Sequence, residues 1–162
     1  MDFPTLTQKF CDAACTSGKD LAQLFTTNGI YHDGFYGAFQ GHDAIEDMID
    51  HYFQRDGEDF LWRMYEPVFA GGIGYARYMF GYTSRIAGHD GRRVVFAGMS
   101  QFRVENGLIS KYTENFDAGV GTAQLGFEAD RIAKRARNNA ERLRSQPDAA
   151  DFLKGAPANI SA

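Results

Sequence analysis

Cysteine, proline and long apolar runs are all scarce in this chain of 162 residues. Its two cysteines, Cys11 and Cys15, share one face of an expected helix, but two thiols supply only half of a zinc site. We therefore interpret them as ordinary buried thiols. No apolar run reaches the roughly 18 residues that a membrane-spanning helix needs. Residues 1–4 lack the basic and apolar regions of a signal peptide, so we expect a cytoplasmic protein.

An excess of positive charge is also absent. The net charge is −4 and the pI about 5.5, so neither a nucleic acid nor a membrane is an expected partner. No phosphate loop, dinucleotide-binding glycine pattern or metal-spaced ligand set is visible, and no cofactor or metal is implied. Aromatic residues, by contrast, make up 14% of the chain, which fits either an apolar cavity or a dense aromatic core.

Helical patterns come first along the chain and strand-like patterns follow. The first helix has Thr5 or Thr7 available as its cap, and the second is expected to end at Asn28 and Gly29. The expected helices are 4–16, 19–25, 42–54 and 122–145. The main strand-like runs are 60–69, 74–86, 93–105 and 108–117. This order predicts one α+β domain with N-terminal helices packed in a strongly curved antiparallel sheet, followed by a C-terminal helix.

The last of these helices is unusually basic. Its cationic residues are Arg131, Lys134, Arg135, Arg137, Arg142 and Arg144. A basic amphipathic helix can bind membranes or acidic partners, but the apolar stripe here is thin and rich in alanine. We expect a solvated outer face that packs on the edge of the sheet or on a second subunit.

One acid, Asp33, lies in a turn between two short strands and has aromatic neighbours on both sides. Burial against aromatic rings raises the pKa of a carboxylate, which is how a protein makes a general base without a cofactor. The alternative is a structural turn residue whose carboxylate accepts from the amides of Gly34 or Phe35.

A second acid, Glu114, lies in the last strand-like run. Strand alternation places Tyr112, Glu114 and Phe116 on one face, which their apolar members predict to be the inner one. Glu114 is either a catalytic group or a strand-end carboxylate paired to Arg103 or Lys111.

Residues 29–45 and 107–117 carry a resemblance to a known family. The second stretch is similar to the signature G-K-I-x-E-x-W-D-x-x-D, with Glu114 and Asp117 at acid positions and Thr113 replacing the tryptophan. Over about residues 5–120 the chain resembles the nuclear transport factor 2-like superfamily, in its SnoaL-like branch. The resemblance implies a cone-shaped domain over 1–120, a helical extension over 121–162, and a homodimer formed through the sheet.

The resemblance also implies relatives with cofactor-free chemistry, among them ketosteroid isomerase, scytalone dehydratase and limonene epoxide hydrolase. None of their sites is matched in full. Gly98 stands where ketosteroid isomerase has a second aspartate, no main strand carries a buried-looking histidine, and Arg77 lacks the Arg-x-Asp pattern of the epoxide hydrolase.

Together these observations predict an acid/base lyase, of dehydratase or deformylating type, or an isomerase. Its substrate would be small, hydrophobic and hydroxylated, most simply an aromatic compound. The catalytic candidates are Asp33, Glu114, Tyr112 and Arg77, and Arg77 would lie either in the cavity or on the opposite sheet face. The substrate-binding candidates are His32, Tyr36, Trp62, Tyr78, Phe96, Phe102, Phe116 and His51. The alternative is a non-catalytic module of the same fold that binds a small ligand or assembles as a dimer.

Overall fold

The computed structural model describes residues 2–155, so residues 156–162 of the expected extension lie outside the described part. The helical elements are α1 (Phe3–Thr16), α2 (Gly18–Ala22), α3 (His42–Asp47), the π-helical turn η1 (Met48–Phe53), α4 (Gln54–Asp56), α5 (Ala118–Gln124), α6 (Ala129–Arg144) and the 3-10 helix η2 (Pro147–Leu153). The strands are β1 (Phe25–Asp33), β2 (Gly37–Gln40), β3 (Gly57–Ala70), β4 (Ile73–Ser84), β5 (Arg93–Glu105) and β6 (Leu108–Phe116).

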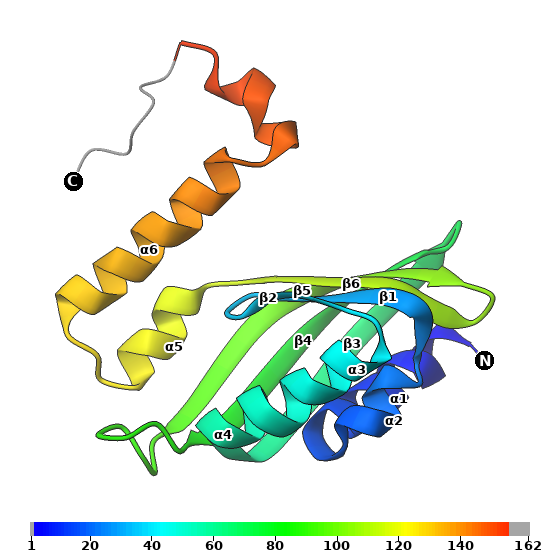
Figure 1. Cartoon of the computed structure of the whole chain (residues 1–162), viewed down its shortest axis with the longest axis horizontal. Helices are drawn as coiled ribbons and strands as arrows, with labels where there is room; N and C mark the ends of the chain where they lie inside the picture. Colours follow the sequence, from blue (N-terminus) through cyan, green and yellow to red (C-terminus); the bar gives the residue numbers. More distant parts are fainter. Residues whose placement is uncertain (1, 156–162) are drawn as a thin grey trace.

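The six strands form one curved sheet in the order β2-β1-β6-β5-β4-β3. Helices α1 to α4 cover one face, as Figure 1 shows, and α5 closes one end of the space between them and the sheet. The α+β cone is therefore confirmed. The expectation of a wholly antiparallel sheet is wrong in one place, because β1 pairs in parallel with β6, with Tyr31 opposite Tyr112.

The ends of the first two helices differ from the sequence-based expectation. Asp2 caps α1, its carboxylate accepting from the Thr5 amide at 2.8 Å, so neither Thr5 nor Thr7 is the cap. The second helix ends at Ala22 rather than near residue 28. Phe25 already begins β1, because its side chain is buried among the aromatic rings of the core.

Aromatic rings fill the closed part of the cone. Phe10 is fully buried, and its ring centroid lies 4.5 Å from that of Tyr112 and 5.8 Å from that of Tyr31. Cys11 is buried beside these rings, and burial raises the pKa of its thiol to about 12. The aromatic content thus supplies a dense core at this end, while other rings line a cavity at the opposite end.

The expected helix 122–145 is two helices instead of one. The chain turns at Gly126, whose φ of +71° suits glycine, and α6 begins only at Ala129. Helix α5 packs on the sheet with Gly121 and Thr122 buried, whereas α6 has no buried residue. Figure 1 shows α6 leading away from the sheet, with η2 at its far end. None of the described helices is both long and apolar enough to cross a membrane.

The face of the sheet opposite the helices carries exposed apolar side chains. They include Leu61, Val68, Tyr75, Met79, Val95 and Met99. These residues alternate along β3, β4 and β5 with the ones that face the helices. The homodimer expected through this face stays a prediction.

Candidate functional site

A cavity of about 290 Å³ opens at the wide end of the cone, between the sheet, α4 and the α5–α6 segment. Its walls are mainly aromatic: Phe35, Tyr36, Phe53, Phe60, Trp62, Tyr78, Phe80, Tyr82, Phe96, Phe116 and Phe127. The polar side chains in the wall are few. They are Asp33, Asp56, Glu114, Thr122, Arg131 and Arg135. Apolar walls with a few polar groups are typical of sites that bind small molecules.

Asp33 enters this cavity from the last position of β1, where it pairs with Gly37 of β2. It is only 2% exposed. Its Oδ1 accepts from the amides of Phe35 at 2.6 Å and Tyr36 at 2.8 Å, which confirms the expected hydrogen bond to Phe35 and adds one to Tyr36. Among the described residues, no donor binds Oδ2, which leaves this oxygen for a ligand in the cavity.

Burial raises the pKa of Asp33 above its ordinary value. The two amides oppose this effect, as do the positive charges of Arg142 and Arg135, because all of them stabilise the carboxylate. Asp33 is therefore a buried carboxylate whose charged form is stabilised by two amides and two arginines.

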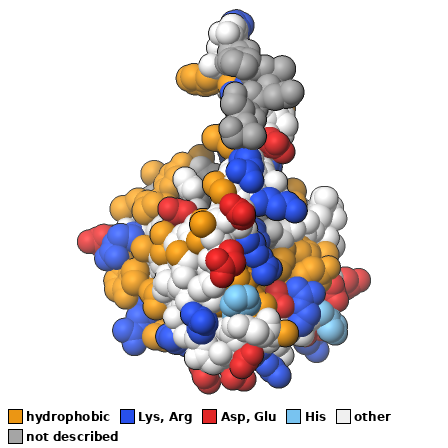
Figure 2. Space-filling view, turned by 90° about the vertical axis from the view of Figure 1, so that its left-hand side faces the viewer, with side chains coloured by type: hydrophobic (Ala, Val, Ile, Leu, Met, Phe, Trp, Pro, Cys, Tyr) orange, Lys and Arg blue, Asp and Glu red, His pale blue; other side chains and the backbone are white. Residues whose placement is uncertain are grey.

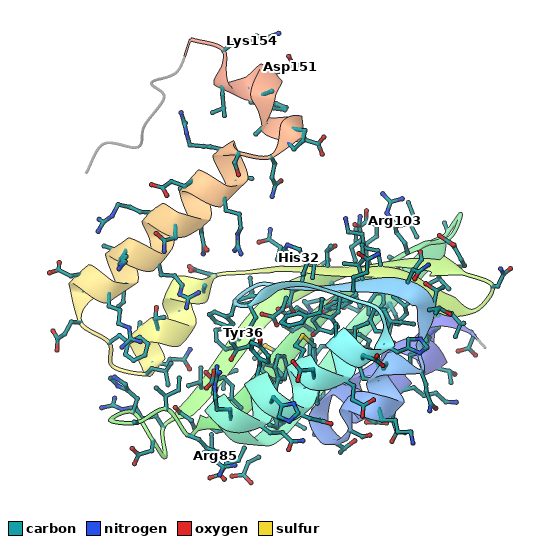
Figure 3. The ribbon with its side chains drawn as sticks, viewed as in Figure 1. His32, Tyr36, Arg85, Arg103, Asp151 and Lys154 are labelled. Carbon is teal, nitrogen blue, oxygen red and sulfur yellow. The ribbon has the colours of Figure 1, made fainter. Side chains whose placement is uncertain are left out.

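Glu114 lies beside Asp33 because β1 and β6 are neighbours in the sheet. Its Oε1 accepts from the Gly34 amide at 3.1 Å, and its Oε2 from the hydroxyls of Tyr78 and Tyr112, both at 3.1 Å. Neither of the two basic residues considered as its partners forms an ion pair with Glu114 within the part of the chain described. In Figure 3, Arg103 lies on the outer side of the sheet.

Burial and the negative charge of Asp33 raise the pKa of Glu114 to about 8. The Gly34 amide and the hydroxyls of Tyr78 and Tyr112 oppose this effect, but no cation is among the opposing groups, whereas two arginines support the charge of Asp33 in addition to its amides. Near neutral pH we therefore assign one proton to the pair, held by Glu114, and one negative charge, held by Asp33. A carboxylate and a carboxylic acid then line the same aromatic cavity, which is an arrangement for proton transfer.

Two further polar groups beside the pair have no partner within residues 2–155. The Tyr31 hydroxyl is fully buried without a hydrogen bond, and so is Nε1 of Trp62, whose side chain lines the cavity. Tyr31 was absent from the predicted site. Its place two residues before Asp33 in the same strand, and thus on the same face, is the signal that could have found it.

The structure brings together most of the predicted site residues. Asp33, Glu114, Tyr36, Trp62, Tyr78, Phe96 and Phe116 all line the cavity. Tyr112 is buried behind the wall and reaches the site only through its hydroxyl, which also lies 2.9 Å from the Ser100 hydroxyl. Phe102 belongs to the closed core, where its ring packs edge-on against Phe10.

Besides Tyr112 and Phe102, three more predicted residues lie outside the cavity. Arg77 is on the outer face of β4, where its guanidinium contacts Glu66 at 3.5 Å and stacks on Tyr65. His51 is exposed and bonded to Asp47, one turn earlier. His32 alternates with Asp33 and lies on the outer side of the sheet in Figure 3, whereas Tyr36 lies on the inner side. A direct catalytic or binding role for Arg77, His51 or His32 thus has no geometric support.

The cationic side of the cavity was not foreseen. Arg131 and Arg135 of α6 reach its mouth, although the basic helix was expected to be only a solvated or interfacial face. Arg131 stacks on Phe127 at 3.7 Å, and Arg135 on Phe35 at 5.0 Å, measured to the ring centroids. Figure 2 looks onto this end of the molecule and shows several basic side chains, in blue, on the face toward the viewer.

The described residues contain no cluster of three or more His, Cys, Asp or Glu side chains that could hold a metal ion. Asp56 at the cavity wall is already engaged, since it accepts from the Tyr36 hydroxyl at 2.6 Å and pairs with Arg55.

A sequence profile of the SnoaL-like domain matches residues 8–112 of this chain. No curated protein matches this chain. The fold is shared with a protein of ketosteroid isomerase-like fold from Catenulispora acidiphila, solved with trimethylamine, at a TM-score of 0.71 and 18% identity, over 80% of this chain and 98% of that one.

Two solved enzymes share the fold as well. One is an epoxide hydrolase of M. tuberculosis, similar to limonene epoxide hydrolase, with a TM-score of 0.61 and 15% identity over 75% of this chain and 87% of that one. The other is a hexachlorocyclohexane dehydrochlorinase of Novosphingobium barchaimii, with a TM-score of 0.60 and 11% identity over 69% and 82%. At these identities the likeness establishes the fold alone.

Proposed function

The chain belongs to the SnoaL-like family, and from this premise we propose that it is a cofactor-independent acid/base enzyme. Asp33 is the base, Glu114 the acid, and the substrate a small aromatic compound with a hydroxyl group. The observation that carries the proposal is the pair itself, two neighbouring carboxyl groups with raised pKa values in the wall of one aromatic cavity. The family includes enzymes of several reaction types, so the site must specify the chemistry.

The reaction that fits this pair best is loss of water from a β-hydroxy carbonyl compound. Oδ2 of Asp33 takes the proton from the carbon next to the carbonyl, and the electron pair forms the new carbon–carbon double bond. The carbon–oxygen bond of the hydroxyl breaks as Glu114 gives it a proton, and water leaves. Asp33 is then protonated and Glu114 ionised, and a proton moves from the first to the second before the next turnover.

Tyr78 contributes by holding the acid in place. Its hydroxyl donates to Glu114, while its ring forms part of the cavity wall. The side chain of Trp62 also forms part of the wall, while its Nε1 is buried behind it. If Asp33 returned its proton to another carbon of the substrate, the same groups would carry out an isomerisation instead.

The competing function is a non-catalytic module that binds a ligand or assembles as a dimer. That function predicts carboxylates that face solvent and have ordinary pKa values. The burial of Asp33 and the raised pKa of Glu114 favour the enzyme.

Exchange of carbon-bound protons in D2O tests the proposal and separates the two roles. Aryl ketones and β-hydroxy aryl ketones would be incubated with the protein and followed by proton NMR. Asp33→Asn should abolish both exchange and dehydration. Glu114→Gln should retain exchange and lose dehydration by about 100-fold or more, because only the acid is removed. Asp20→Asn, at an exposed aspartate far from the cavity, is the matched control. Full activity in Asp33→Asn would refute the assignment.

A further inference from the structure

The mouth of the cavity carries two cations that make no direct contact with the proposed acid and base, although the charge of Arg135 stabilises the Asp33 carboxylate. Arg131 and Arg135 both line the cavity and lie four residues apart, so they share one face of α6. Neither forms an ion pair with a carboxylate in the part of the chain that the structure describes. Each guanidinium lies over an aromatic ring, that of Phe127 for Arg131 and that of Phe35 for Arg135, and Arg135 also acts on Asp33 through its charge.

Both guanidinium groups lie over ring faces. A ring face attracts the cation but occupies none of its N–H donors, so the edges of both groups remain available. The same geometry limits the side-chain entropy lost when an anion binds. The planar, two-oxygen acceptor that matches such edges is a carboxylate.

The negative groups of the cavity do not neutralise this end. Asp33 has its own amide donors, Asp56 is engaged by Arg55 and Tyr36, and burial raises the pKa of Glu114 to about 8, which disfavours its charged form at neutral pH. The chain as a whole is acidic, with a net charge of −4, so its overall field does not attract an anion. Any preference for an anionic ligand must therefore come from the local charges of α6.

We propose that the substrate is an aromatic carboxylic acid, with its ring among the aromatic walls and its carboxylate between Arg131 and Arg135. This inference rests on the proposed function for the reaction but concerns the other end of the substrate. A phenylpropanoid skeleton provides the required pattern, an aryl ring and a carboxylate separated by a short chain, and its size suits a cavity of about 290 Å³.

Binding of 3-phenylpropanoate and 3-phenylpropanamide tests this inference without requiring turnover. The two probes have nearly the same shape and differ in charge. Calorimetry gives the affinities, and the fluorescence of Trp62, the only tryptophan of the chain and a cavity residue, reports where the probe binds. At low salt we expect the acid to bind about 10-fold more tightly than the amide, and added salt to reduce this preference.

Substitutions then assign the preference to the two arginines. Arg131→Gln and Arg135→Gln should each weaken binding of the acid by about 3- to 10-fold and change binding of the amide by less than about 2-fold. Arg137→Gln removes the same charge from an exposed position of the same helix outside the cavity wall, and should change neither. Thermal unfolding of each variant checks that the fold is retained.

Equal binding of the two probes overturns the inference, as does an acid preference that survives Arg131→Gln combined with Arg135→Gln. Absence of binding by either probe would also overturn it. These results are separable from failure of the proposed function. Arg131→Gln can lose the acid preference and keep the D2O exchange, because Arg131 is not among the charges that act on Asp33, and a protein without exchange can still bind the acid selectively.

Discussion

Replacing Glu114 by glutamine should change how the free energy of unfolding depends on pH. The pKa of Glu114 is raised from 4.5 to about 8 in the folded protein, so between these values the folded state binds more protons than the unfolded one. The stability that this residue provides is therefore complete below about pH 4.5, falls as the pH rises, and is lost above about pH 8.

The pKa values set the size of the effect. At about 1.4 kcal/mol per pH unit, the difference corresponds to roughly 5 kcal/mol as an upper limit. Glu114 is half-buried and borders an open cavity, so solvent screens its charge and we expect about 2–4 kcal/mol. Glutamine keeps the shape, accepts from the Gly34 amide and carries no charge at any pH.

Urea unfolding at pH 5, 7 and 9 measures this difference. Relative to Glu114→Gln, the wild-type protein should lose about 2–4 kcal/mol of unfolding free energy between pH 5 and pH 9. Glu141→Gln, at an exposed position of α6, is the control and should follow the wild-type profile. Parallel profiles for wild type and Glu114→Gln would refute the raised pKa and, with it, the assignment of a proton to Glu114 at neutral pH.

Three further predictions concern the surroundings of this acid and the outer face of the sheet. Tyr78→Phe removes a donor that favours the charged form of Glu114, so the pKa of Glu114 should rise. The loss of activity at high pH, which Glu114 sets, should then occur above about pH 8. An unchanged pH dependence of activity would contradict the contact. Gly98→Ala places a Cβ 2.6 Å from the Tyr78 hydroxyl and 2.7 Å from the Asn115 carbonyl, and should cost about 1–3 kcal/mol in urea unfolding together with most of the activity. Wild-type stability in that variant would show that the strands can move apart. Sedimentation should detect a homodimer that Met99→Glu dissociates and Leu143→Glu does not, and a monomeric wild type would refute the dimer.

Local patterns predicted the parts of the structure that depend on neighbouring residues. Alternation placed Tyr112, Glu114 and Phe116 on the inner face of β6 correctly, because side chains of any strand alternate. It could not decide whether Arg77 or Tyr78 faced inward, since both sets on β4 contain aromatic residues. That choice depends on which face the helices cover, and the structure turns Tyr78 inward.

Contacts between distant segments account for what the sequence did not predict. The parallel pairing of β1 with β6 brings Glu114 beside Asp33 over a separation of about 80 residues, and no local pattern encodes it. The position of Arg135 at the cavity mouth likewise depends on the turn at Gly126, which separates α6 from α5. The reason for a glycine at position 98 is likewise visible only in the sheet, where Gly98 leaves room for the Tyr78 ring of the neighbouring strand.

Helix α6 contributes side chains to the cavity mouth and yet has no buried residue of its own. Substitutions along it should therefore have little effect on folding, since exposed positions typically change stability by less than about 0.5 kcal/mol. The cone, with its tightly packed rings, does not tolerate substitution in the same way. Ligand preference in this architecture can consequently evolve by changes in one surface helix, while the acid and the base inside the cone are inherited unchanged.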